Sequence, residues 1–196
     1  MRGTLDGRSS RNRLALAAIL GVAIAPPLFL RFPYPDHPPL AHTGGFAEPT
    51  CQRCHFGAPL NTPEGALTLS APNHYDGERT YQLHIELERP GMRRAGFQLA
   101  ARFSEGVRAG RQAGALRATS DRLEVVMDST GIQYAQHRHA GSALLKPGRA
   151  SWTVDWTAPD AREPVVFHLV ANAANDDASE FGDYIYAVSF PVAPKR

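Results

Sequence analysis

The sequence predicts an all-β fold, an antiparallel β-sandwich that occupies residues 65–196 of the 196-residue chain. Segments of alternating apolar and polar residues recur from Gly65 onward. Turn signals rich in Gly, Pro, Asn and Asp separate them, and no amphipathic helical segment of useful length lies among them. About seven or eight short strands at this spacing are typical of two sheets that each bury one face.

Five segments carry the clearest alternation. In TYQLHIEL, for example, Leu83, Ile85 and Leu87 share one face while His84 and Glu86 take the other. Strands are therefore expected in residues 80–87, 95–103, 150–157, 163–172 and 183–192, with shorter ones in 65–70 and 122–127.

The N-terminus predicts a membrane anchor. Residues 1–13 carry four Arg against one Asp, and residues 14–30 carry no charge, a length at the short end of what spans a bilayer. Ala25 ends a small-residue cleavage box, yet Pro26 would follow the cut, so we expect a retained anchor, with a cleaved signal as the alternative. The positive flank favours a single-pass protein of the cell inner membrane with a cytoplasmic N-terminus and a periplasmic body.

The segment between anchor and sandwich divides in two. Residues 31–50 hold five prolines and two glycines, which predicts an extended tether, and residues 51–64 contain both cysteines of the chain. The net charge of +2 derives from the basic flank, and no basic stripe is interleaved with aromatic residues. A nucleic-acid partner is therefore not expected.

The cysteines form a CxxCH motif made of Cys51, Cys54 and His55. A disulfide or redox pair is one interpretation, although such motifs normally open a helix in a thioredoxin-like βαβ unit. A zinc site is another, but it needs a fourth ligand from elsewhere. The interpretation that uses every residue is one covalent haem c, with two thiols on the porphyrin vinyl groups and His55 as proximal iron ligand.

Several stretches together resemble a known family: HTGGFAEPTCQRCH, AGFQLAARF, YAQHRHAG, SWTVDWTAP and ANAANDDASEFGDYIYAVSF. They are similar to the Reeler-like β-sandwich domains of bacterial exported proteins, many of which open with a TG…TCxxCH segment. Some of these are membrane-anchored single-haem cytochromes. Over residues 42–192, the resemblance implies a Reeler/immunoglobulin-like sandwich that bears one haem c.

The motif leaves the distal iron ligand open. The resemblance implies His137, because these domains commonly carry a Y-x-x-H segment that Tyr134 and His137 match. Met92, in a turn expected to be exposed, and His42, in the tether, are the alternatives. The identity matters because His/Met ligation raises the reduction potential relative to bis-His ligation.

An amide-rich and acidic cluster lies near the end of the sandwich. Its oxygens would suit calcium, but turn chemistry explains them better. Its members are Asn172, Asn175, Asp176, Asp177 and Asp183. The chain offers no Ser-His-Asp set and no phosphate loop, so neither an enzyme nor a small-molecule substrate is expected.

The sequence thus predicts a membrane-anchored monohaem c-type cytochrome that carries single electrons on the periplasmic side. Its expected partners are the lipid bilayer and a membrane electron-transport complex, respiratory or photosynthetic, or another cytochrome. The alternative is an anchored β-sandwich that binds or supports a partner, in which the CxxC is a disulfide or the haem is inactive in turnover.

Overall fold

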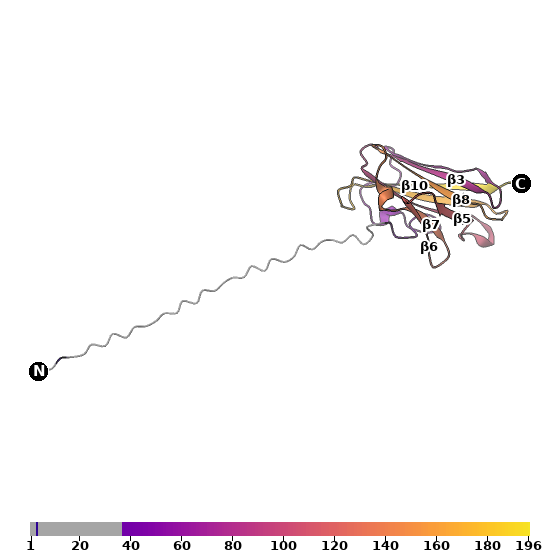
Figure 1. Ribbon diagram of the computed structural model, residues 1–196, viewed down its shortest axis with the longest axis horizontal. Helices are drawn as coiled ribbons and strands as arrows, with labels where there is room; N and C mark the ends of the chain where they lie inside the picture. Colours follow the sequence, from indigo (N-terminus) through magenta and orange to yellow (C-terminus); the bar gives the residue numbers. More distant parts are fainter. Residues whose placement is uncertain (1–2, 4–36) are drawn as a thin grey trace. The chain divides into compact units, whose positions relative to one another are not determined.

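The computed structural model describes Gly3 and residues 37–196 (Figure 1). Apart from Gly3, the predicted basic flank lies outside the described residues, as do the anchor over residues 14–30 and the start of the tether. Within the described part, no helix is long and apolar enough to cross a membrane. The helical elements there are three short 3₁₀ turns, η1 (Cys51–Arg53), η2 (Gly106–Arg108) and η3 (His139–Ser142).

Two β-sheets make up the described domain, which confirms the predicted β-sandwich. The four-stranded sheet has the order β1 (Ala66–Ser70), β3 (Thr80–Glu88), β8 (Arg149–Thr157), β5 (Ala115–Ala118). The six-stranded sheet has the order β2 (His74–Tyr75), β10 (Tyr184–Pro194), β9 (Val165–Ala174), β4 (Arg94–Phe103), β7 (Gln133–His137), β6 (Leu123–Met127). All pairings are antiparallel except that of β10 with the two-residue β2.

The core between the sheets follows the predicted alternation. On β3, Leu83, Ile85 and Leu87 are buried, whereas His84 is exposed. On β8, Trp152 and Trp156 are buried, and each indole N–H donates to a backbone carbonyl at 2.9 Å. Burial of one large apolar side chain contributes about 1.5–3 kcal/mol, so this core supplies most of the driving force for folding.

Strand β4 is buried on both of its faces. Phe97 and Leu99 point into the core, while the side chains of Gln98 and Arg102 alternate to the outer face, away from the four-stranded sheet, and are also buried. The described part of the predicted tether, residues 37–50, covers that outer face. It has no helix or strand, and it is packed on the sheet through hydrogen bonds with Gln98.

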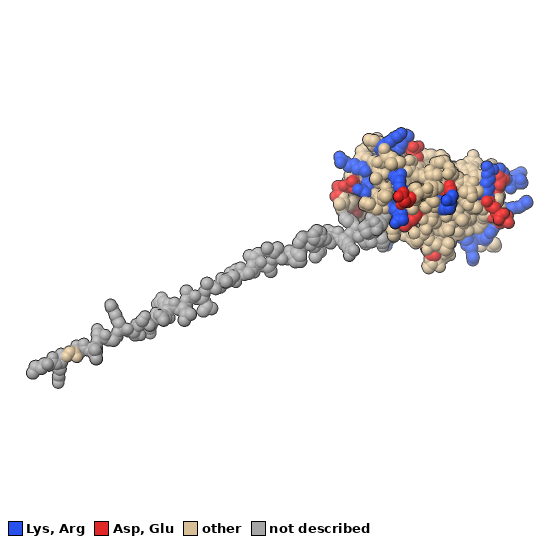
Figure 2. Space-filling model, in the orientation of Figure 1, with Lys and Arg blue, Asp and Glu red and all other residues tan. Residues whose placement is uncertain are grey.

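Charged side chains of both signs are interspersed on the face of the domain that Figure 2 shows, with uncharged surface between them. A mixed surface of this kind creates no strong field of one sign on that face.

Candidate functional site

The N-terminal segment is held on the outer face of β4 by hydrogen bonds. Gln98, fully buried, donates from its amide to the Pro39 carbonyl at 2.9 Å and accepts from the backbone N–H of His42 at 2.7 Å. The residues between those two pack against a small apolar cluster made of Ala100, Ile132 and Tyr134. One polar side chain of the sheet therefore sets the position of the segment.

A buried ion pair holds the next part of the segment. Glu48 accepts from the guanidinium of Arg102, from the Tyr134 hydroxyl at 2.6 Å and from the Thr43 hydroxyl at 2.5 Å. The Arg102 side chain is only 6% exposed and that of Glu48 only 10%. Removal of one partner from such a pair leaves an uncompensated buried charge, so this contact locks the segment in place.

The CxxCH motif begins on a single 3₁₀ turn, η1, shortly after Glu48. The Thr50 hydroxyl caps η1 by accepting from the Gln52 amide at 3.2 Å, and the amides of Cys54 and His55 donate to the Cys51 carbonyl at 3.2 and 3.0 Å. The turn brings both cysteines and the histidine together. Cys51 is half-buried and Cys54 is exposed.

Both cysteines are free thiols in the described structure. Burial raises the pKa of the Cys51 thiol to about 12. A thiol that stays protonated is a poor redox nucleophile, because thiolate is the reactive form. Among residues 37–196, no group of three or more His, Cys, Asp and Glu side chains is arranged to hold a metal ion. The zinc interpretation therefore finds no fourth ligand in the described part of the chain.

His55 is oriented by a buried carboxylate. Its Nδ1 lies 2.7 Å from Oδ2 of Asp183, whose side chain is only 2% exposed, whereas that of His55 is 37% exposed. Asp183 also accepts from the Asn172 amide at 3.0 Å and from the Asn175 backbone N–H at 3.2 Å. Because the carboxylate accepts, Nδ1 carries the proton and Nε2 keeps its lone pair, as in metal-binding histidines.

Asp183 and Asn172 are the site residues that sequence reasoning missed. Turn chemistry does explain Asn175 and Asp177, which accept from backbone N–H groups two residues ahead at 3.1 and 2.9 Å. Asp183 and Asn172 are instead buried against His55 from more than 100 residues away. The signal in the sequence was their place in the NAAN…GD stretch, the most specific part of the family resemblance apart from the motif.

Exposed aromatic side chains adjoin the motif. Phe56 and Phe181 are 45% and 61% exposed, and their ring centroids lie 5.8 Å apart. Backbone hydrogen bonds tie them together, since the Phe56 amide donates to the Glu180 carbonyl at 2.7 Å and its carbonyl accepts from Gly182 at 2.9 Å. Exposed apolar surface beside a cluster of polar side chains is typical of a ligand-binding site. It suits a flat, largely apolar group such as a porphyrin.

His137 ends β7 and lies on the same outer face as His55. Its Nδ1 is 3.0 Å from the amide nitrogen and 3.2 Å from the carbonyl oxygen of Phe97, beyond the last residue pair of the β4–β7 ladder. Its ring lies over Gly96, where an added Cβ would come within 2.3 Å of it. Gly96 pairs with Asn172 on the neighbouring strand, and Asn172 contacts His55. His137 and His55 therefore lie beside two paired residues whose strands are about 5 Å apart.

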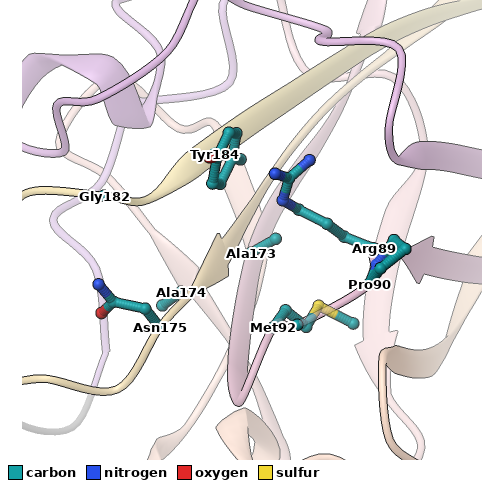
Figure 3. A pocket seen from close by; sticks show the side chains of 9 residues that line it. Arg89, Pro90, Met92, Ala173, Ala174, Asn175, Gly182 and Tyr184 are labelled. Atoms are coloured by element: carbon teal, nitrogen blue, oxygen red, sulfur yellow. The ribbon is translucent and has the colours of Figure 1, made fainter.

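Met92 was expected in an exposed turn, and this expectation was wrong. It is 6% exposed and belongs to the inter-sheet core. It lines a hollow of about 220 Å³. Figure 3 shows it among the lining side chains, which include Arg89 and Tyr184. Ala173 lines the same hollow from the core face of β9, whereas its neighbour Asn172 points to the outer face. Met92 thus belongs to the core, whereas His55 contacts the outward-pointing Asn172.

His42, the remaining candidate ligand, is half-buried on the outer face of β4. Its backbone N–H is bound by Gln98, and its Nδ1 lies 2.8 Å from the Leu40 carbonyl oxygen. The structure therefore brings His42, His55 and His137 to one face of the six-stranded sheet and leaves Met92 on the other.

No protein-family model and no curated protein matches the chain. Among solved structures, it is similar to the reeler domain of human F-spondin, with 20% identity over 71% of this chain and 95% of that one and a TM-score of 0.46. It is also similar to the Reelin-N domain of F-spondin, with 18% identity over 74% and 96% and a TM-score of 0.42.

A cohesin module of a family 33 glycoside hydrolase from Clostridium perfringens ATCC13124 is a further similar structure, with 13% identity over 68% and 98% and a TM-score of 0.46. These likenesses, which include Reeler domains, concern the β-sandwich alone and carry no argument about function.

Proposed function

We propose that this chain is a membrane-anchored monohaem c-type cytochrome that carries single electrons on the periplasmic side. In this proposal Cys51 and Cys54 hold the porphyrin through thioether bonds, and His55 is the proximal iron ligand. The observation that carries the proposal is the hydrogen bond from His55 to the buried Asp183, since it leaves Nε2 of a CxxCH histidine free to bind iron.

The donor set fits a haem in two further respects. Both thiols are free, and the exposed Cys54 makes the motif accessible to the attachment chemistry. Phe56 and Phe181 present apolar rings beside it. A haem bound there would supply one-electron cycling of iron between its ferric and ferrous states.

The chain's own residues would hold that group and leave it accessible. Asp183 would hold the His55 ring in the orientation that leaves Nε2 available to the group. His55 is more than one-third exposed and Cys54 is on the surface, so the residues that would hold the group are accessible to a docked protein. Electron transfer between proteins needs such access.

In this proposal, attachment to the membrane determines which partners the protein meets. A head held at the membrane surface meets membrane-bound partners at a raised effective concentration. We therefore expect the partner to be a subunit of a membrane electron-transport complex or another cytochrome at the periplasmic surface of the inner membrane.

The test is covalent haem attachment to the full chain. It would be produced in a bacterial host with a c-type maturation system, purified from membranes, denatured and assayed as the pyridine haemochrome. We expect one haem per chain and a reduced α-band at about 550 nm. The variant Cys51→Ala/Cys54→Ala should retain no haem after denaturation, whereas the matched control Ser104→Ala should retain it fully.

A wild-type chain that carries no haem would overturn the proposal. A Cys51–Cys54 disulfide found in that material by mass spectrometry would favour the anchored binding module instead. Retention of haem by the double-cysteine variant would show non-covalent binding and would also contradict the proposal.

A further inference from the structure

The second axial position of the haem has three candidate side chains, and their hydrogen bonds separate them. An imidazole binds iron through a nitrogen lone pair. The binding nitrogen must therefore carry no proton and must not already accept a hydrogen bond.

His42 meets this requirement. Its Nδ1 lies 2.8 Å from the Leu40 carbonyl oxygen, and a carbonyl oxygen only accepts, so Nδ1 is the protonated nitrogen. The lone pair of the neutral ring is then on Nε2. His55 has the same arrangement, with Asp183 in place of the carbonyl. Both histidines are thus prepared in the way that metal-binding histidines commonly are.

The loop between His42 and Cys51 folds back on itself. The Gly44 amide donates to the Pro49 carbonyl at 3.0 Å, which closes the loop on itself. Gly44 has a φ of +75°, a conformation that glycine adopts without strain, and an added Cβ would lie 3.1 Å from the Thr50 side chain. His42 lies two residues before Gly44, and Cys51 lies two residues after Pro49. The two residues therefore occupy equivalent positions on the two sides of the loop.

His137 is less suited to the role. Its Nδ1 contacts both backbone polar groups of Phe97, the amide nitrogen at 3.0 Å and the carbonyl oxygen at 3.2 Å, so the ring is held by the backbone of β4. Backbone pairing between β4 and β7 ends at Gln98, so Phe97 has no backbone partner on β7. The His137 ring takes the place of that partner, which is a structural role. Met92 lies on the far side of the six-stranded sheet, in the core.

We propose that His42 is the second axial ligand, so that the iron is held by two histidines from the two ends of one loop, residues 42–55. The inference rests on the proposed function, because it requires the haem that Cys51 and Cys54 would hold. Bis-histidine ligation lowers the reduction potential relative to His/Met ligation and closes the iron to external ligands.

The experiment compares the full-length haem-loaded chain with His42→Ala, His137→Gln and Met92→Leu. Carbon monoxide is added to each ferrous protein, and the Soret spectrum is recorded. We expect wild type, His137→Gln and Met92→Leu to bind no carbon monoxide, and His42→Ala to bind it stoichiometrically. Added imidazole should restore the six-coordinate spectrum of oxidised His42→Ala, which loss of a merely structural side chain would not allow.

A second variant covers the case in which His42→Ala is unstable. His42→Met should gain a charge-transfer band at about 695 nm in the oxidised state and a raised potential. The same band in the wild type would show methionine ligation and overturn the inference without any variant. So would carbon monoxide binding by His137→Gln with none by His42→Ala.

The pyridine haemochrome assay distinguishes the two possible failures. One covalent haem per chain in every variant, with no effect of His42→Ala on carbon monoxide binding, overturns the ligand assignment alone. A wild-type chain without haem overturns both the assignment and the proposed function.

Discussion

On the inner face of the six-stranded sheet, Phe97, Leu99 and Phe167 pack against the tryptophans of β8. On its outer face, Gln98 and Arg102 are buried beneath residues 37–50. The inner face is held by apolar burial, which has little directional preference. The outer face is held by hydrogen bonds and one ion pair, which specify geometry. The comparison teaches that the same sheet provides stability on one side and the placement of the CxxCH segment on the other.

The largest expected effect is on the inner face. Phe167→Ala should lower the free energy of unfolding by about 4 kcal/mol, because it removes a fully buried ring and leaves a cavity. Urea unfolding followed by the fluorescence of the β8 tryptophans measures it. The exposed Val107→Ala is the control and should change stability by less than about 0.5 kcal/mol. Similar losses in both variants would contradict the division between the faces.

Glu48→Gln tests the outer face. We expect a loss of about 3 kcal/mol, because Arg102 would keep its charge in a buried site without a carboxylate. Limited proteolysis should then cut within residues 37–50 before it cuts the sandwich. The control Glu64→Gln removes a carboxylate that is 63% exposed and lies 3.6 Å from Arg89, and it should be nearly neutral. Resistance of residues 37–50 to the protease in Glu48→Gln would refute the locking role.

The pH dependence of stability should sharpen the same comparison. Burial lowers the pKa of His137 from 6.5 to about 4, so the unfolded chain binds a proton more readily than the folded chain. The stabilising contribution is therefore complete above pH 6.5 and is lost as the pH falls toward 4, by about 2 kcal/mol between pH 6.5 and 5. Urea unfolding at both pH values should show this loss in wild type and a smaller one in His137→Gln. Equal losses would exclude His137 as the source.

Gly96→Ala is expected to have the smallest effect. The new Cβ would lie within 2.3 Å of the His137 ring, and displacement of that ring should cost about 1 kcal/mol. Gly77→Ala is the matched control, since its Cβ would meet nothing nearer than 3.4 Å. Thermal unfolding of the two variants provides the comparison, and equal midpoints would show that the ring moves without cost.

The inner face was predictable from the sequence because alternation reports burial on one side only. Leu83 and Phe97 were placed correctly by it. The strand over Gln133–His137 was missed, because Gln136 is buried on the outer face beneath the N-terminal segment and breaks the apolar pattern. Burial of the outer face depends on hydrogen bonds to a segment that has no apolar periodicity. No local sequence pattern therefore predicts it.

The candidate site divides in the same way. Cys51, Cys54 and His55 were found because their chemistry requires a fixed local spacing. Asp183 was assigned to turn chemistry, because its contact with His55 arises from the register of β9 and β10. The environment of Met92 was misjudged for a related reason, since a turn at the end of a sandwich can fold into the core.

The separation of His55 from Asp183 along the chain has a consequence for the order of events during biogenesis. The two residues are 128 positions apart, and Asp183 immediately precedes the last strand. Chains are synthesised, and their parts can fold, from the N-terminus onward. The motif therefore emerges well before the carboxylate that orients its histidine, and its histidine stays without that partner until β10 joins the sheet. Closure of the sandwich then marks the end of that interval.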